Sequence, residues 1–342
     1  MLSEDITSKP KRFISTQHPL IDMTIGHPGI PCGRVCSFFG HSSTGKTTIC
    51  YHILAETQRL GGVAILIDAE YALDPDRAAA IGIDCASLIV LEPDTLDECI
   101  TYIEEVVKYV REEDPDCLVT IVLDSVAGIS TQAEEDDKGG IGGHARVMSR
   151  GLRRITKKIS NLDIALVIVN QYKDKIDAMA FAEKTAMIAE KPIRFHSTIG
   201  MEVAQVTKIP DPKTKEIIGI TSRARNKKNK IAAPFREATF EVSFANPGGI
   251  NIIEGFFQLG LQTGVIVKKG SRYALDIEGK ESKTFYQKEF TRVLRDNPDL
   301  LGILHSKLPA GFVYPPESRM WHILDDVVDD EIDEDMEMDE AA

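Results

Sequence analysis

The chain has 342 residues, of which 43% are hydrophobic and 27% are charged, and its formal net charge is −13 at pH 7. These proportions are ordinary for a globular protein, and no apolar run approaches the ~18 residues that a membrane-spanning helix needs. The acidic start of the chain lacks the basic and apolar regions of a secretory signal, so we expect a cytoplasmic location. The length allows one large domain with a smaller companion.

The cysteines are scattered and form no Cys-x-x-Cys pair, so we expect reduced packing residues rather than zinc ligands or a redox pair. They are Cys32, Cys36, Cys50, Cys85, Cys99 and Cys117.

An octet rich in glycine and hydroxyl residues follows the apolar run 35–39 and precedes a helical pattern. Its terminal glycines let the backbone curl so that several N–H groups and a helix N-terminus point at one anion. We therefore predict a phosphate-binding loop, in which Lys46 binds the β and γ phosphates and Thr47 offers a hydroxyl to Mg²⁺. The alternative is a glycine-rich turn that binds nothing. The residues, with the adjoining Thr48, are Gly40, His41, Ser42, Ser43, Thr44, Gly45, Lys46 and Thr47.

Four unbroken apolar runs each end at polar residues, as strands buried on both faces of a parallel sheet do. Helical patterns separate them, at about 47–60, 95–112 and 145–162. This alternation predicts a doubly wound α/β layer whose ligands lie beyond the carboxyl ends of the strands. The runs are 38–39 before Gly40, 63–67 before Asp68, 119–123 before Asp124, and 165–169 before Asn170 and Gln171.

Acidic residues at these strand ends predict the rest of a nucleotide site. Asp124 is placed to hold Mg²⁺ opposite Thr47. Strand alternation puts Asp68 and Glu70 on one face, so one of them could orient or deprotonate an attacking water. Any one of these acids could instead be a helix cap.

Six motifs together resemble the bacterial RecA recombinase family, in the family's order and from about residue 14 to residue 264. The resemblance implies a RecA-type P-loop NTPase core, with a mostly parallel twisted sheet flanked by helices, that binds ATP and Mg²⁺. The motifs are the octet 40–47, Ile67-Asp68-Ala69-Glu70-Tyr71-Ala72-Leu73-Asp74-Pro75, Pro93-Asp94-Thr95, Asp124-Ser125-Val126-Ala127, Val169-Asn170-Gln171 and Lys228-Asn229-Lys230-Ile231-Ala232-Ala233-Pro234-Phe235.

The resemblance implies a role for each of several site residues. Glu70 would activate water, and Gln171 would link the γ-phosphate to a second DNA-binding loop. Lys228 and Lys230 would reach the ATP of a neighbouring subunit, although a solvated basic turn is the alternative.

The adenine site of the family is only partly matched. Asp74 would meet the adenine amino group. Arg77 stands where the family usually has an aromatic residue that stacks on adenine, and a guanidinium can also stack on a purine.

A helix at about 145–162 has an apolar face opposite a cationic stripe, which fits a nucleic-acid backbone but also a solvated surface. The resemblance favours DNA, with Arg146, Ser149 and Arg153 facing it. The stripe consists of Arg146, Arg150, Arg153, Arg154, Lys157 and Lys158, and the apolar face of Met148, Leu152, Ile155, Ile159 and Leu162.

Two loops flank this helix in the predicted DNA site. The first loop, at 134–143, begins with acidic residues that would repel phosphate. We therefore assign DNA contacts in it only to Ile141, Gly142 and Gly143. The second loop, between 172 and 193, carries Lys173 and Lys175, and its apolar residues Met179 and Phe181 could wedge between bases. It departs from the family form, because it contains a helix-like run at 178–189.

Subunit contacts and domains are predicted less completely. Arg194-Phe195 resembles the family's interface strand, whereas Gly200 replaces a usual arginine and the N-terminal arm is short. We divide the chain into an arm (1–12), the ATPase core (13–264), a small α+β C-terminal domain (265–316), and a linker with a disordered acidic tail (317–342). The C-terminal domain is predicted to begin with a hairpin at 265–275 and to continue with helices at 284–296 and 299–307. Eleven acidic residues follow Arg319, and the tail either regulates DNA access or serves solubility.

The leading hypothesis is a DNA-dependent ATPase that forms filaments on single-stranded DNA and exchanges strands with homologous duplex. The alternatives are a RecA-like oligomeric ATPase that acts on protein partners, a hexameric helicase, and a small-molecule P-loop kinase, for which the sequence offers no acceptor site or lid.

Overall fold

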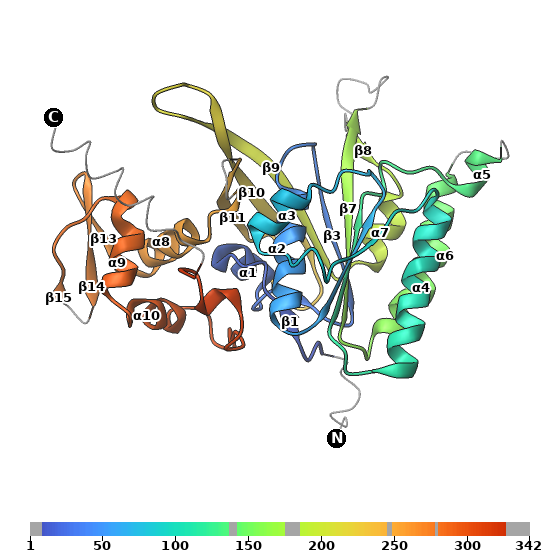
Figure 1. Ribbon diagram of the computed structural model, residues 1–342, viewed down its shortest axis with the longest axis horizontal. Coiled ribbons are helices and arrows are strands. Elements are labelled where there is room, and N and C mark those ends of the chain that lie inside the picture. The colour runs from blue at the N-terminus through green and yellow to red at the C-terminus, as the bar shows by residue number, and fades with distance from the viewer. Residues whose placement is uncertain (1–8, 137–141, 175–184, 245–247, 278–279, 326–342) are drawn as a thin grey trace.

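A ten-stranded sheet forms the centre of the computed structural model, which describes residues 9–136, 142–174, 185–244, 248–277 and 280–325 (Figure 1). Its strands run in the order β12-β11-β10-β9-β3-β7-β6-β4-β5, and β8 pairs with β7 beside this path. The parallel part contains β9 (Ile199–Pro210), β3 (Arg34–Gly40), β7 (Ile164–Asp174), β6 (Val119–Asp124), β4 (Val63–Asp68) and β5 (Ile89–Leu91).

Antiparallel strands complete the edges. The long hairpin of β9 and β10 projects beyond the body of the sheet (Figure 1). These strands are β10 (Ile217–Asn229), β11 (Glu237–Ser243), β12 (Gly249–Ile250) and β8 (Thr185–Met187), and a separate pair joins β1 (Phe13–Ile14) to β2 (Ile30–Pro31).

Helices cover both faces of the sheet, as the alternation of strands and helices predicts. Along β7, Val167 and Val169 pack toward α2, whereas Leu166 and Ile168 pack toward α4 and α6. The predicted α/β class is therefore confirmed. One face carries α1 (Pro19–Ile25), α2 (Lys46–Arg59) and α3 (Pro75–Ile81), and the other carries α4 (Leu96–Glu113), α6 (Gly143–Ile159) and α7 (Glu190–His196), with the short α5 (Gln132–Glu135) before α6.

The predicted helices agree with α2, α4 and α6 to within three residues at each end. Local capping explains the start of α4, where the hydroxyl of Thr95 accepts a hydrogen bond from the N–H of Glu98. No helix among the described residues is long and apolar enough to cross a membrane.

Two hydrophobic cores lie between the central sheet and the helices on its two faces. A third hydrophobic core lies in the C-terminal part of the chain, at the left of Figure 1. The predicted hairpin at 265–275 is confirmed as β13 and β14, and two short helices follow it. This part comprises α8 (Ile252–Thr263), β13 (Ile266–Lys269), β14 (Arg272–Ile277), β15 (Lys280–Glu281), η2 (Gln287–Glu289), α9 (Phe290–Asp296), α10 (Leu300–Ser306) and η3 (Arg319–Trp321).

The segment 317–325 is folded onto the protein, so its assignment to a linker was wrong. Met320 and Ile323 are buried in the third core because their apolar side chains fill it. The Arg319 N–H donates to Oε2 of Glu56 at 3.1 Å, and Arg59 pairs with Asp325 at 3.9 Å. The C-terminal segment is therefore attached to the far end of α2, the helix that begins at the octet.

Two other expectations concern the segment around the second loop. Of the helix-like run at 178–189, residues 178–184 lie outside the described residues, whereas 185–187 form the strand β8, which pairs with β7 because strand pairing overrides local helix propensity. The expected strand at Arg194-Phe195 was wrong. Arg194 and Phe195 lie in α7 rather than in a strand, and Pro192 is tolerated there because it occupies the first turn.

All six cysteines are free thiols. Cys32, Cys36, Cys50 and Cys99 are buried and serve as packing residues. Cys85 is exposed and Cys117 is half-buried, so the packing role does not extend to Cys85.

Candidate functional site

The octet forms a tight loop between β3 and α2. Gly45 has φ +92°, and at Gly40 a Cβ atom would lie 2.0 Å from the carbonyl oxygen of Val203, so both positions require glycine. Gly45 supplies no side-chain cap to α2, which leaves the N–H groups of the first turn available to an anion. The hydroxyl of Ser222 donates to the carbonyl of Thr44 at 2.9 Å and fixes the loop against β10.

Lys46 lies across this loop. Its Nζ donates to the carbonyl oxygen of His41 at 2.6 Å, and burial lowers its pKa. An ammonium in this position can neutralise the phosphates that the loop would hold.

Thr47 and Asp124 meet at the carboxyl edge of the sheet, as predicted. The Thr47 hydroxyl donates to Oδ2 of Asp124 at 2.7 Å, and burial raises the pKa of Asp124 to about 6. A hydroxyl and a carboxylate are suitable ligands for Mg²⁺, which usually takes one or two carboxylates together with phosphate oxygens and water. Among the described residues, no cluster of three or more His, Cys, Asp or Glu side chains forms another candidate metal site.

A chain of hydrogen bonds joins the octet to Glu70. Ser42 donates to Oε1 of Gln171 at 3.1 Å, and Nε2 of Gln171 donates to Oε1 of Glu70 at 2.7 Å. The hydroxyl of Ser125 also donates to Oε1 of Glu70. Sequence reasoning did not identify Ser125 as a site residue, although its position directly after Asp124 could have indicated it.

Asp68 has a different role from Glu70. Its buried carboxylate accepts hydrogen bonds from the N–H groups of Ala72 at 2.9 Å and Leu73 at 2.8 Å, which fixes the turn after β4. The strand ends at Asp68, so alternation does not extend to Glu70, which is exposed. Of the two acids, Glu70 is therefore the one placed beside the octet.

Asp74 is the N-cap of α3. Its Oδ1 accepts from the N–H groups of Asp76 at 3.1 Å and Arg77 at 3.2 Å, a cap role that the sequence did not predict for Asp74. The guanidinium of Arg77 donates from Nη2 to Oγ1 of Thr48 at 2.6 Å. Both side chains thus lie beside the first turns of α2 and α3.

Lys228 and Lys230 converge on the end of α7. Nζ of Lys230 donates to the carbonyl of Phe195 at 3.1 Å, and Nζ of Lys228 donates to the carbonyls of Phe195, at 3.2 Å, and Arg194. Burial, together with the charges of Lys230 and Arg194, lowers the pKa of Lys228 to about 8. The two lysines are therefore tied to the element that follows the second loop.

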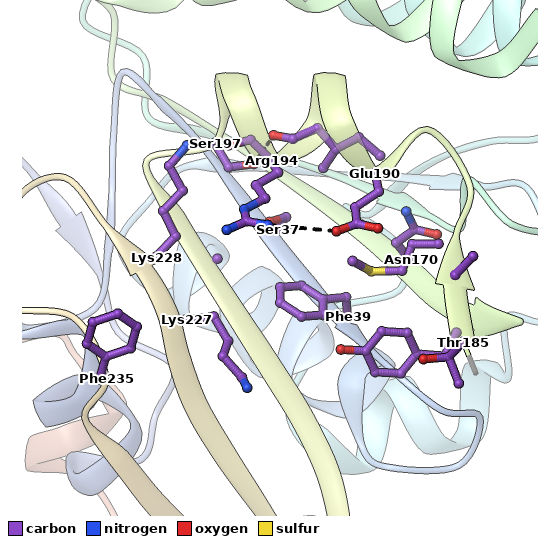
Figure 2. A pocket seen from close by; sticks show the side chains of 15 residues that line it. Ser37, Phe39, Asn170, Thr185, Glu190, Arg194, Ser197, Lys227, Lys228 and Phe235 are labelled. Atoms are coloured by element: carbon purple, nitrogen blue, oxygen red, sulfur yellow. Dashed lines mark hydrogen bonds and ion pairs between the residues drawn. The ribbon is translucent and has the colours of Figure 1, made fainter. Parts of the chain in front are cut away.

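A cavity of about 500 Å³ opens beside Lys228, between β3, β7, β8, α7, β9 and β10 (Figure 2). Arg194 and Glu190, one turn apart on α7, point toward each other at its edge, with 4.0 Å between Nη1 and Oε1. Gly200 also lines the cavity, and a Cβ atom there would lie 3.2 Å from Cβ of Lys228. Because this position has no side chain, the space that a larger residue would occupy is part of the cavity.

The basic face of α6 is exposed as predicted, whereas its apolar face packs against the sheet and α4. Arg146 and Arg153 are exposed and Ser149 is half-buried. Arg154, at the edge of the stripe, pairs with Glu104 of α4 at 2.6 Å, so its charge is partly compensated.

The loop residues of the predicted DNA site are only partly described. Gly142 is the N-cap of α6, Gly143 is its first residue, and Lys173 is exposed on β7. Ile141 and Lys175 lie outside the described residues.

The parallel sheet, the octet and the Thr47–Asp124 contact define the class of P-loop α/β proteins. Residues 3–251 match the family model of the RecA N-terminal domain. The chain is similar to Protein RecA of Frankia alni, with 33% identity over 311 residues that cover 89% of this chain and 85% of that protein. Protein RecA of Paenarthrobacter aurescens is 32% identical over 92% of this chain and 88% of its own length, and that of Corynebacterium jeikeium is 31% identical over 98% and 87%. The chain belongs to the RecA family.

Proposed function

We propose that the protein is an ATP-dependent, DNA-stimulated recombinase that forms filaments on single-stranded DNA and promotes homologous pairing and strand exchange. The observation that carries this proposal is the chain of hydrogen bonds from Ser42 through Gln171 to Glu70. It links the phosphate-binding loop to the candidate base, and Gln171 lies on β7, the strand that leads to the second loop.

In this proposal the octet, with Thr48, holds the triphosphate of ATP. Thr47 and Asp124 hold Mg²⁺, which supplies charge neutralisation on the phosphates. Glu70 orients the attacking water and accepts its proton, while Gln171 contacts the γ-phosphate. Asp74 and Arg77 complete the nucleotide site at the end that holds the nucleoside.

A second subunit would complete the reaction centre. Lys228 and Lys230 would then neutralise charge on the γ-phosphate bound by the neighbouring copy. Their present contacts with the end of α7 support a link between DNA and hydrolysis, because α7 follows the second loop. A change in that loop would move the carbonyls that hold both lysines.

DNA would bind along α6 and its flanking loops. The exposed stripe of basic residues there supports contact with a phosphate backbone. The predicted contacts are Ile141, Gly142, Gly143, Arg146, Ser149, Arg153, Lys173 and Lys175, and both single-stranded and double-stranded DNA are proposed partners. A cytoplasmic location fits this role.

The decisive experiment measures ATP hydrolysis with and without single-stranded DNA and images the same mixtures by electron microscopy. We expect stimulation by DNA together with helical filaments. Rings with directional unwinding would indicate a hexameric helicase. Hydrolysis that responds to a protein partner but never to DNA would indicate an oligomeric ATPase of a different class.

A further inference from the structure

The contact between Arg77 and Thr48 bears on which nucleotides the site accepts. Thr48 is buried on the first turn of α2, directly after the two residues predicted to serve the β and γ phosphates and Mg²⁺. In a phosphate-binding loop the backbone around this first turn cradles the α and β phosphates. A side chain bonded to Thr48 Oγ1 therefore lies beside the phosphate chain, at the end nearer the sugar.

Local structure fixes the direction of Arg77. Pro75 begins α3, and the carboxylate of Asp74 accepts the N–H of Arg77 at 3.2 Å, so the backbone that carries the guanidinium is held in place. The side chain then spans from α3 to α2, where Nη2 reaches Thr48 at 2.6 Å.

The charge of Arg77 is not compensated by a carboxylate. Within the described part of the chain, Arg77 makes no ion pair, and its one side-chain hydrogen bond is to the neutral hydroxyl of Thr48. A guanidinium has five N–H donors in a planar fork that matches phosphate oxygens. Four donors thus remain for an anionic group beside Thr48.

We propose that Arg77 binds the α-phosphate of the nucleotide, and that the site therefore recognises the polyphosphate more than the base and accepts guanine and pyrimidine nucleoside triphosphates as well as ATP. This inference rests on the proposed function, because it requires that the octet bind a nucleoside triphosphate. It differs from stacking on adenine, which would make the contribution of Arg77 depend on the base.

The test measures dissociation constants of ATP, GTP and CTP by competition against a fluorescent nucleotide. We expect the three constants of the unmodified chain to agree within about tenfold. Arg77→Ala should weaken all three by a similar factor, roughly 10- to 100-fold, which is the range for a hydrogen bond to a charged group. Arg77→Gln, which keeps a donor of similar reach without the charge, should show most of this loss.

One further variant separates base recognition from phosphate recognition, and a second serves as a control. Arg77→Tyr, which introduces the aromatic type usual in the family, should weaken CTP more than ATP. Arg111→Ala, at an exposed arginine of α4, should leave all three constants unchanged. Thermal unfolding of each variant verifies that the fold is intact.

The outcomes distinguish this inference from the proposed function. If Lys46→Ala does not impair ATP binding, the proposed nucleotide site is wrong and the role of Arg77 is rejected with it. If Lys46→Ala abolishes binding while Arg77→Ala has no effect, or weakens ATP but not CTP, only the inference on Arg77 is overturned.

Discussion

Gln171 donates a hydrogen bond to Glu70 across 2.7 Å, although the two residues are 101 positions apart. The sheet makes this contact possible, because β4 and β7 both flank β6 and end at the same edge. The same Oε1 atom of Glu70 accepts from Ser125, so two donors hold the carboxylate in one orientation. The proposed role of Glu70 as a base can be tested separately from nucleotide binding.

Glu70→Gln should abolish ATP turnover, with a loss of roughly 10²- to 10⁴-fold, because the amide cannot accept a proton from water. ATP-dependent binding to single-stranded DNA should persist, since neither the octet nor α6 changes. Steady-state hydrolysis and fluorescence anisotropy of labelled DNA, measured on the same preparation, report the two properties.

Glu112→Gln is the matched control, because it removes one carboxylate from an exposed position of α4. It should leave both hydrolysis and DNA binding unchanged. Undiminished hydrolysis by Glu70→Gln would contradict the role assigned to Glu70.

Arg146→Ala should weaken single-stranded DNA binding and make it less sensitive to salt. The loss of one phosphate contact should reduce the slope of log K against log salt concentration by about 0.7. Titrations at several salt concentrations measure this slope directly.

Arg154→Ala is a control on the same helix. The Arg154 side chain already pairs with Glu104, so we expect a smaller change in affinity and slope than for Arg146→Ala. Equal effects of the two substitutions would mean that the helix contributes only a diffuse positive charge.

Removal of residues 326–342 should speed binding to duplex DNA at low salt. This segment carries ten acidic residues, which can compete with phosphates for basic surfaces. A variant in which the same acids are replaced by Asn and Gln, at constant length, should bind equally fast. Stopped-flow association rates that match those of the full chain would show that the acids do not regulate access.

His18 should make the protein less stable in acid. Burial lowers its folded-state pKa to about 3, from an ordinary value of 6.5, so protons bind preferentially to the unfolded chain as the pH falls below about 6.5. Between pH 7 and pH 5 this costs about 2 kcal/mol. Asp22 acts with the opposite sign, because burial raises its pKa to about 7, and a comparison between variants removes its contribution.

His18→Asn keeps an acceptor at the N-cap of α1, where Nδ1 of His18 accepts from the N–H of Ile21 at 3.4 Å. Urea unfolding at pH 7 and pH 5 should show that this variant loses about 2 kcal/mol less stability than the unmodified chain. His322→Asn, in the C-terminal segment, should lose as much as the unmodified chain. Burial also lowers the pKa of His52 to about 3, and its contribution is common to all three proteins, so an identical loss in all three would exclude His18 as an acid-sensitive group.

The sequence predicts the parts of this structure that depend on local patterns. Unbroken apolar runs predict β4, β6 and β7, because strands buried on both faces contain few polar residues. Glycine spacing predicts the octet. The Thr47–Asp124 contact follows from the shared edge at which parallel strands end.

Other features depend on contacts that no local pattern encodes. The residues of β8 have helix propensity, yet they pair with β7. Asp68 fixes the turn after β4 whereas Glu70 lies beside the octet, and this difference depends on where β4 ends. Apolar content alone defines the ends of strands poorly. The contacts of Lys228 and Lys230 require the position of α7, which a resemblance at Arg194-Phe195 assigned to a strand.

The attachment of residues 314–325 sets a practical boundary for shortening the protein. Tyr314 donates to buried Asp22 at 3.1 Å, and the N–H of Arg319 donates to Glu56, so removal of this segment would leave two buried carboxylates with fewer donors. A truncation after residue 316 keeps Tyr314 but removes the donor to Glu56 and the partner of Arg59, so it would act on α2 and, through that helix, on the octet 40–47. A truncation after Asp325 keeps both contacts and removes ten acidic residues, so the two shortened proteins should not be treated as equivalent.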